Sequence, residues 1–146
     1  MKRRVIVAAL IKNQDNEYLI CKMPKSRGAY PGKWAIPGGG INANETILEA
    51  LNREIKEEIE EELIISKITP WNFKDHIVKK LYPDGKIEEI YMICLIFDCF
   101  AENKIIKLNE EFEKYAWVLP ENIKSYDLNA ATKWTFQQKN FSNKKS

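Results

Sequence analysis

Apolar residues in this chain occur in short runs that polar or turn-forming residues separate. Runs of roughly four to eight apolar residues, rich in β-branched and aromatic types and bounded in this way, are typical of strands. Polar turns at 13–16 and 82–85 join two pairs of neighbouring runs into predicted hairpins. The predicted strands lie at residues 5–11, 18–23, 34–36, 63–69, 76–81, 89–100 and 115–118.

Two of these runs carry further information about the sheet. The run 89–100 contains IYMICLIFDCF, which is too apolar to leave one face in water, so it predicts a central strand. Pro70 and Trp71 follow the run 63–69. Because a proline cannot donate a hydrogen bond to a neighbouring strand, we expect the strand to stop there.

Residues from Thr46 onward predict an acidic helix. Thr46 and Glu49 have the spacing of a capping box, in which each side chain accepts a hydrogen bond from the other residue's backbone N–H. At about 100° per residue, one face of the helix is apolar and a neighbouring arc is acidic. The apolar face consists of Leu48, Leu51, Ile55 and Ile59 with Ile47 at its edge, the acidic arc of Glu54, Glu57, Glu58 and Glu61, and Arg53, Lys56 and Glu60 point elsewhere, toward solvent or a neighbouring loop.

The last part of the chain predicts a second helix, AATKWTFQQK, with Asn129 as its N-cap and a helical turn at 120–122 before it. Strands, one acidic helix, more strands and a terminal helix indicate an α+β or sandwich-type fold. With 146 residues, the chain is expected to form one domain over residues 1–139. The polar, basic segment 140–146 is expected to be loose.

Composition and charge restrict the function without naming it. Hydrophobic residues make up 45% of the chain and charged residues 30%, as in ordinary soluble domains. A net charge of +2 gives no indication of a nucleic-acid polymer as partner. The basic start and the apolar run behind it resemble a signal peptide, but the run is short and no small-residue cleavage site follows, so a buried strand fits better. No stretch reaches the length of a membrane span.

The cysteines and the single histidine offer little catalytic chemistry. Cys21, Cys94 and Cys99 lie in apolar surroundings without metal-type spacing, and their odd number argues against a disulfide framework. These features indicate a reducing compartment, and we expect the protein in the cytoplasm. His76 has no evident catalytic partner, so a surface or packing role is favoured over that of a general base.

The acidic arc and the glycines before it are the strongest candidates for a functional site. Like charges three and four residues apart destabilise a helix, so the arc is either a solvated face or a site that a cation neutralises. The glycines at 38–40 can turn sharply and approach a ligand closely. The basic loop 24–33 contains Arg27, whose planar donors suit phosphate oxygens. Solvation explains this loop and the strand residue Lys22 equally well.

Gly39, Glu45 and the run Arg53-Glu54-Ile55-Lys56-Glu57-Glu58 share the residue types and spacing of a known signature. In these positions the chain resembles the Nudix family, hydrolases that act on nucleoside diphosphates linked to another group. One position departs from the pattern, because Glu60 stands where the family usually has a glycine. A glycine there suits a helix end in the left-handed region, so we expect this helix to run on or to end differently.

The resemblance implies a fold and a metal site. The fold would be an α/β/α sandwich, with a mixed sheet between helices and the signature forming a loop, a helix and a loop. Mg²⁺, for which Mn²⁺ can substitute, would bind the carboxylates of Glu54, Glu57 and Glu58 and the carbonyl of Gly38. These three glutamates would also be the catalytic residues.

Further roles follow from the same resemblance. Glu45 and Arg53 would pair and hold the loop on the helix. Glu111, with Glu110 as the alternative, would supply a further ligand or a general base. Asn129 would read the base of the substrate, although its role as a helix cap could account for it fully. The candidate substrate contacts are Lys22, Arg27, Gly39 and Asn129.

Segments beyond the signature narrow the expected substrate. TPW with Phe73, EEIYMICLIFDC, NEEFEKYAWV and YDLNAAT resemble a bacterial group of nucleoside triphosphatases within the family. This likeness implies hydrolysis of dUTP, dTTP and dCTP to the monophosphate and pyrophosphate. The alternatives are an oxidised purine deoxynucleotide or a nucleotide sugar as substrate, or a catalytically silent nucleotide-binding module. A monomer and a homodimer both fit the sequence.

Overall fold

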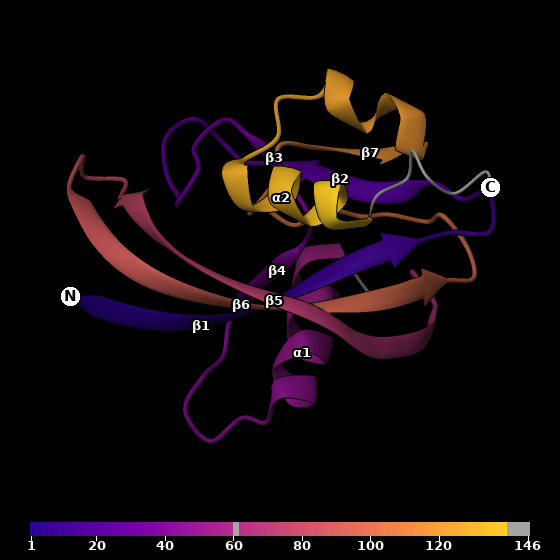
Figure 1. The fold of residues 1–146 in the computed structure, drawn as a ribbon, viewed down its shortest axis with the longest axis horizontal. Coiled ribbons are helices and arrows are strands. Elements are labelled where there is room, and N and C mark those ends of the chain that lie inside the picture. The colour runs from indigo at the N-terminus through magenta and orange to yellow at the C-terminus, as the bar shows by residue number, and fades with distance from the viewer. Residues whose placement is uncertain (60–61, 140–146) are drawn as a thin grey trace.

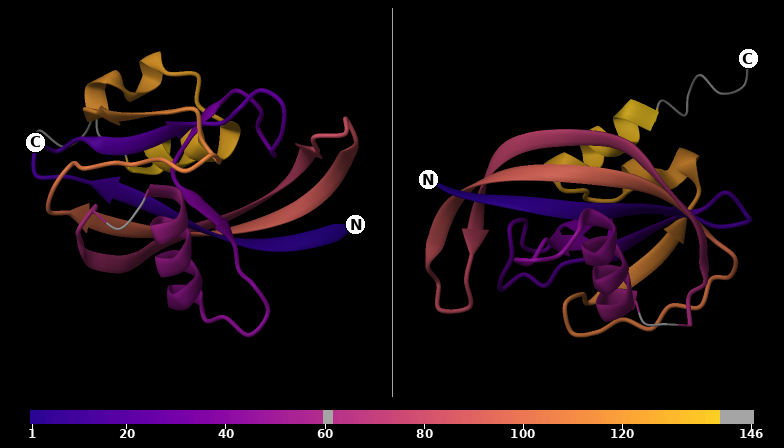
Figure 2. Two further views of the ribbon diagram at one scale, coloured as in Figure 1. Left: turned by 180° about the vertical axis from the view of Figure 1, so that it is seen from behind. Right: turned by 90° about the horizontal axis from the view of Figure 1, so that it is seen from below.

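One mixed β-sheet forms the centre of the protein, which we describe from a computed structural model over residues 1–59 and 62–139 (Figures 1 and 2). In this part of the chain, a seven-stranded sheet has the order β3-β2-β1-β6-β5, with β4 beside β1 and β7 beside β2. The strands are β1 (Lys2–Lys12), β2 (Tyr18–Lys22), β3 (Trp34–Ala35), β4 (Gly38–Gly40), β5 (Ile65–Leu81), β6 (Ile87–Ala101) and β7 (Lys114–Val118). The helices are α1 (Ile47–Ile59), the 3₁₀ helix η1 (Pro120–Ser125) and α2 (Ala130–Lys139).

Strand β6 is an interior strand, as its apolar sequence predicted. It pairs in parallel with β1, so that Lys2 to Lys12 lie opposite Ile90 to Phe100, and antiparallel with β5 on its other side. Parallel strands need a long connection between them, and here every element from β2 to β5 lies between the two in sequence. The first strand therefore depends on a partner that is distant along the chain.

Both predicted hairpins form, but they differ in extent. Strands β5 and β6 pair along their whole length, and the turn between them has Gly85 at a φ of +89°, a conformation that favours glycine. Strands β1 and β2 pair only at Lys12 and Tyr18. The rest of β2 pairs with β3 and β7 instead.

The helices α1 and α2 lie on opposite faces of the sheet, α1 below it and α2 above it in Figure 1. Alternate residues of β1 point to these two faces. On the α1 side, the core contains Val7, Ala9 and Ile11 of β1 with Leu51, Ile55 and Ile59 of α1. On the α2 side, it contains Ala8 and Leu10 of β1 with Phe136 of α2. The expected α/β/α sandwich is confirmed.

The predicted strand break at Pro70 and Trp71 is wrong. Strand β5 runs without interruption from Ile65 to Leu81, and only a shift in register between Pro70 and Asn72 marks the site. Strand β5 is at the end of the sheet order. An edge strand needs no second neighbour, so the missing N–H of a proline costs it little.

The predicted apolar face of α1 is also partly wrong. Leu48 is 52% exposed and Ile47 is 42% exposed, whereas Ala50 and Leu51 are fully buried. Figure 1 shows the helix beginning at its end farthest from the sheet, where the preceding loop delivers it. The first turn therefore lies beyond the sheet, and its apolar side chains find no core to pack against.

Asn129 caps α2, as predicted. Its Oδ1 accepts a hydrogen bond from the Thr132 N–H at 2.7 Å, which satisfies a donor that the first turn of a helix leaves free. The helical turn expected at 120–122 is the start of η1. The signature's departure at Glu60, the acidic-arc residue Glu61 and the tail 140–146 lie outside the described residues.

The three cysteines are free thiols. Burial raises the pKa of the Cys94 thiol to about 11 and that of the Cys99 thiol to about 12. Since the thiolate is the nucleophile, neither side chain is reactive near neutral pH. None of the helices in the described ranges is both long and apolar enough to cross a bilayer.

Candidate active site

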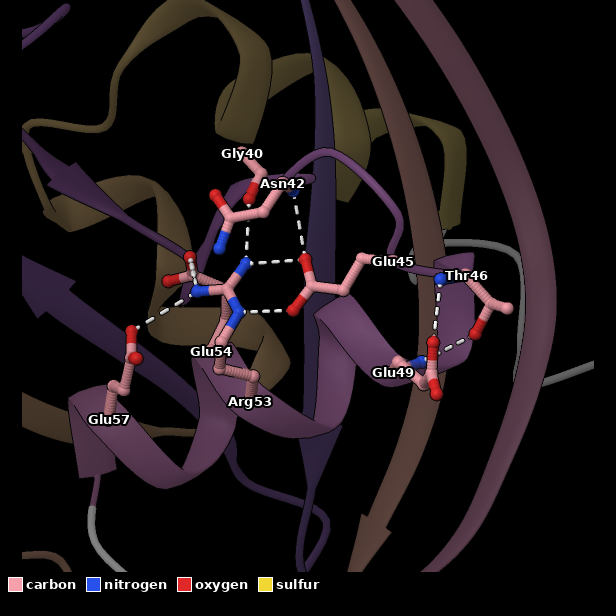
Figure 3. Close-up of polar contacts among 8 residues, drawn as sticks. All are labelled: Gly40, Asn42, Glu45, Thr46, Glu49, Arg53, Glu54 and Glu57. Carbon is pink, nitrogen blue, oxygen red and sulfur yellow. Dashed lines mark hydrogen bonds and ion pairs between the residues drawn. The ribbon is translucent and has the colours of Figure 1, made fainter.

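Helix α1 begins with the predicted capping box (Figure 3). Thr46 Oγ1 accepts a hydrogen bond from the Glu49 N–H at 3.1 Å, and Glu49 Oε1 accepts one from the Thr46 N–H at 2.9 Å. The box satisfies N–H groups that have no partner within the helix. The start of the helix is therefore well defined, and with it the positions of the glutamates that follow.

The guanidinium of Arg53 joins this helix to the loop before it (Figure 3). Arg53 Nη2 donates to the Gly40 carbonyl and to Glu45 Oε1, at 2.9 Å each, and Arg53 Nε donates to Glu45 Oε2. The bonds from Arg53, together with the Asn42 N–H, lower the pKa of the Glu45 carboxyl. The expected pairing of Glu45 with Arg53 is confirmed, and it holds the loop on the helix.

Arg53 also turns back onto the acidic arc. Its Nη1 donates to Glu54 Oε2 at 2.8 Å and to Glu57 Oε1 at 3.2 Å. The Glu57 side chain remains 54% exposed. One guanidinium therefore compensates part of the negative charge on two carboxylates while it also bonds to the loop.

The glycines of β4 leave space that a side chain would fill. A Cβ on Gly39 would lie 2.3 Å from Glu54 Cδ and 2.4 Å from each of its carboxylate oxygens. A Cβ on Gly38 would lie 2.3 Å from the Val7 carbonyl oxygen. Glycine at these positions therefore allows β4 to lie against β1 and the Glu54 carboxylate to lie against the loop backbone.

Glu58 is the most buried carboxylate among the described residues of the arc. It is only 4% exposed, and its Oε1 accepts a hydrogen bond from the Gly38 N–H at 2.9 Å. Burial, followed by the charges of Glu54 and Glu111, raises its pKa well above the ordinary value. Burial also raises the pKa of Glu54, although Arg53 opposes this effect. Within the described ranges, no cationic side chain forms an ion pair with Glu58.

Glu54, Glu58 and the glycines of β4 border one cleft with a volume of about 500 Å³. Residues of β1, β5 and β6 line it, together with residues of α2, β3, β4 and the loop 27–30. The expected site residues that line the cleft are Arg27, Gly38, Gly39, Glu54, Glu58, Glu111 and Asn129. Segments that are far apart in the sequence thus contribute to a single site.

Two expected site residues, Lys22 and Glu57, are not among the residues that line the cleft. Lys22 Nζ lies 3.5 Å from Oε1 of Glu113, the residue just before β7. Glu57 bonds to Arg53, and its own backbone carbonyl accepts a hydrogen bond from Asn109 Nδ2. Both side chains therefore lie beside the cleft with partners of their own.

Arg27 connects the basic loop to the segment that bears Glu111. Arg27 Nη2 donates to the Glu110 carbonyl at 2.6 Å, and Arg27 lines the cleft. The Glu111 N–H in turn donates to Asn109 Oδ1 at 2.8 Å. These contacts place a guanidinium and a carboxylate at the same margin of the cleft that Glu54 and Glu58 of α1 also line.

Comparison with known proteins decides the family. A model described as the NUDIX domain matches residues 2–142. The chain belongs to the NUDIX family. The nucleoside triphosphatase NudI of Escherichia coli (strain K12) is 55% identical to this NUDIX chain over 139 residues, which cover 95% of this chain and 98% of that protein. The expected class of enzyme, a hydrolase of acid anhydrides, is confirmed.

Solved structures share the NUDIX fold. The MutT protein from Methanosarcina mazei Go1 superposes with a TM-score of 0.71 at 27% identity, over 99% of this chain and 97% of that one. The NUDIX domain of Shewanella oneidensis NrtR, solved with ADP ribose, gives a TM-score of 0.72 over 96% of this chain and 88% of that one. Its identity of 12% shows likeness of fold alone.

NUDIX hydrolases generally use divalent metal ions, and the donors at this site suit such an ion. Carboxylate and carbonyl oxygens are the ligands of hard cations, and the buried Glu58 lacks a cationic partner among the described residues. In their present arrangement, no three Asp, Glu, Cys or His side chains of residues 1–59 and 62–139 converge to chelate one ion. In this arrangement, Glu54 Oε2 and Glu57 Oε1 both accept hydrogen bonds from Arg53 Nη1.

Sequence reasoning missed several polar side chains of the NUDIX cleft, among them Arg4, Tyr30, Lys74, His76 and Lys80. They come from β1, β5 and the basic loop. The alternation of a strand predicts which of its residues share a face, but not which faces of two distant strands meet. His76 packs against the Tyr30 ring with 6.2 Å between ring centroids, which agrees with the expected packing role.

Proposed function

We propose that this NUDIX enzyme hydrolyses nucleoside triphosphates in a Mg²⁺-dependent reaction, with a preference for dUTP, dTTP and dCTP. The observation that carries the proposal is the buried Glu58 carboxylate at a cleft that also presents cationic side chains. Such a cleft suits a polyphosphate held together with a metal ion. The 55% identity with NudI, a nucleoside triphosphatase by name, supports this choice of substrate.

The residues proposed to hold the ion are Glu54, Glu57, Glu58 and the carbonyl of Gly38. When it is bound, the ion supplies neutralisation of phosphate charge and a lower pKa for coordinated water. Rotation of the Glu54 and Glu57 carboxylates away from Arg53 would free their oxygens for this role. Arg53 would keep its bonds to Glu45 and Gly40, so the loop would stay in place.

The chain's own residues position the remaining groups. A water oxygen attacks phosphorus, the bond to the pyrophosphate oxygen breaks, and the water's proton passes to a carboxylate. Glu111 is proposed as that base, because it lines the cleft and its side chain is exposed. Arg27, at the same margin, is proposed to hold phosphate oxygens with its planar donors. The products are the nucleoside monophosphate and pyrophosphate.

The base of the nucleotide is proposed to lie beneath α2. This part of the cleft is lined by Ala8, Ile96, Ala131 and Thr132, which carry no charge and suit a planar uncharged ring. Asn129 lies at the same place, with its Oδ1 engaged by the Thr132 N–H. Its amide group is the polar contact proposed to recognise the base.

The proposed enzyme acts as one domain over residues 1–139 in the cytoplasm. Its three free thiols support a reducing compartment. Nucleotides of the cytoplasm would be its substrates.

Formation of monophosphate and pyrophosphate tests the proposal directly. The purified protein is incubated with Mg²⁺ and each deoxy- or ribonucleoside triphosphate, an oxidised guanine nucleotide or a nucleotide sugar, and each reaction is repeated with a chelator. We expect the fastest turnover with dUTP, dTTP or dCTP and none with the chelator. Turnover of the other compounds alone would overturn the pyrimidine preference. No turnover of any compound would favour the nucleotide-binding module.

A further inference from the structure

Several cations in the cleft have no assigned function, among them Arg4 and Lys80. Arg4 of β1 and Lys80 of β5 both line it. Among the ion pairs of the described residues, none involves either side chain. Lys80 Nζ lies 5.1 Å from the centroid of the Tyr82 ring. Two positive charges outside these ion pairs therefore line one cleft.

Backbone segments lie close to both cations. Arg4 lies against Gly40, where a Cβ would come within 1.8 Å of Arg4 Nη2. The basic loop reaches the end of β5 through two backbone hydrogen bonds, from Gly28 N–H to the Leu81 carbonyl at 2.8 Å and from Leu81 N–H to the Gly28 carbonyl at 2.9 Å. Arg4 therefore lies beside β4, and the basic loop lies beside the end of β5 that bears Lys80.

Glu111 connects this end of the cleft to the acidic end. Burial, and then the positive charges of Arg4 and Lys2, lower the pKa of Lys80, whereas Glu88 and then Glu111 raise it. Glu111 also raises the pKa values of Glu54 and Glu58. Arg4, Lys80, Glu54, Glu58 and Glu111 all line the same cleft. Arg4 lies against Gly40 and the Glu54 carboxylate lies against Gly39, so Arg4 is next to the acidic end.

This order of charges matches the parts of a nucleoside triphosphate. We propose that Arg4 and Lys80 form a binding site for the terminal phosphates, the part that leaves as pyrophosphate, while the reacting phosphorus lies at the carboxylates. The inference rests on the proposed function and adds a selection rule to it. A free triphosphate ends in several negative charges, whereas a nucleotide sugar carries a neutral sugar there, so the site favours triphosphates.

Neighbouring residues provide matched controls for both cations. Arg4→Gln and Lys80→Gln are compared with Arg3→Gln and Lys79→Gln, which remove the same charge. Consecutive residues of a strand point to opposite faces, and Arg3 and Lys79 are both exposed. We expect the KM for dTTP to rise about tenfold in each test variant, the loss of one charge-assisted contact, and to stay within about twofold in the controls.

Product inhibition locates the effect along the substrate. The inhibition constant of pyrophosphate should rise about tenfold in Arg4→Gln and Lys80→Gln, while that of thymidine monophosphate stays unchanged. Lys80→Arg, which keeps the charge, should restore inhibition by pyrophosphate. Equal weakening of both products would overturn the inference, because it would indicate a general disturbance of the cleft.

Binding of inorganic triphosphate separates the site from the reaction. Calorimetry on the full chain in a chelator, at low ionic strength, should show about tenfold weaker binding in the test variants than in the controls. This result would support the site even if the wild type hydrolysed no triphosphate. Equal binding by all four variants, in an enzyme that does hydrolyse dTTP, would overturn the site and leave the proposed function intact.

Discussion

The charged side chains in the two halves of α1 differ in their bonding partners. In the first half, Glu49 bonds to Thr46, and Arg53 bonds to Glu45 and the Gly40 carbonyl. In the second half, Glu58 is buried with one N–H as its partner and with other carboxylates nearby. The paired charges stabilise the loop-helix unit, whereas the unpaired charge costs stability until a ligand neutralises it. Similar side chains therefore serve structure at one end and chemistry at the other.

The strongest test of this difference is Glu58→Gln. We expect kcat with dTTP and Mg²⁺ to fall about a thousandfold, because several kcal/mol of charge stabilisation depend on the metal ligands. The fold should persist, since a glutamine oxygen can still accept the hydrogen bond from the Gly38 N–H. Glu49→Gln removes the same charge from the paired half and should leave kcat within about twofold. A comparable fall in kcat in both variants would contradict the proposed difference between the two halves of α1.

The thermal stability of the metal-free protein also tests the difference between the two halves of α1. Because the pKa of Glu58 is raised in the folded state, the folded form binds its proton more tightly than the unfolded form. This contribution to stability is present below the ordinary glutamate pKa and is lost as the pH rises through the raised value. In a chelator, Glu58→Gln should therefore raise the melting temperature at pH 7 by about 2–5 °C. Calorimetric melting at pH 4 and pH 7 checks this, and a lower melting temperature at pH 7 would contradict it.

Arg53→Lys should disrupt the bonds that hold the first half of α1 to the loop before it. A lysine keeps the charge but lacks the planar fork that bonds to Glu45 and Gly40 together. We expect the free energy of unfolding to fall by about 2 kcal/mol, as for the loss of charge-assisted hydrogen bonds in a partly buried site. Urea denaturation measures the change. Lys56→Gln, an exposed change on the same helix, is the control and should alter stability by less than about 0.5 kcal/mol.

Thr46→Ala should have the smallest effect. Loss of the hydroxyl from the capping box is expected to lower the free energy of unfolding by about 1 kcal/mol. The kcat should not change, because the site lies at the other half of the helix. Urea denaturation and a dTTP assay on the same preparation provide both values. A fall in kcat without a change in stability would show that the first turn takes part in the chemistry.

Local sequence signals predicted much of this molecule. The capping box at Thr46, the cap at Asn129 and the turn at Gly85 each depend on residues a few positions apart, and all three are confirmed. The resemblance to the Nudix family also implied the pairing of Glu45 with Arg53. Such features need no knowledge of the rest of the fold.

The remaining features depend on contacts between distant segments. Pro70 is tolerated because β5 is an edge strand, and Leu48 is exposed because the first turn of α1 lies beyond the sheet. Neither fact is visible in the residues nearby. Helical spacing likewise placed Glu57 and Glu58 on one arc, but their different burial depends on the strands beside them. Arg4 and Lys80 line one cleft only because β1 and β5 lie on either side of β6 in the sheet.

The parallel pairing of β1 with β6 has a consequence for synthesis on the ribosome. Strand β1 emerges first, but the chain must be made past Phe100 before its full partner exists. Until then the apolar row of Val7, Ala9 and Ile11 has no β6 beside it, and exposed apolar strands of nascent chains are prone to aggregate. The cleft is complete only when β5, β6 and α2 have all emerged, because residues of each line it.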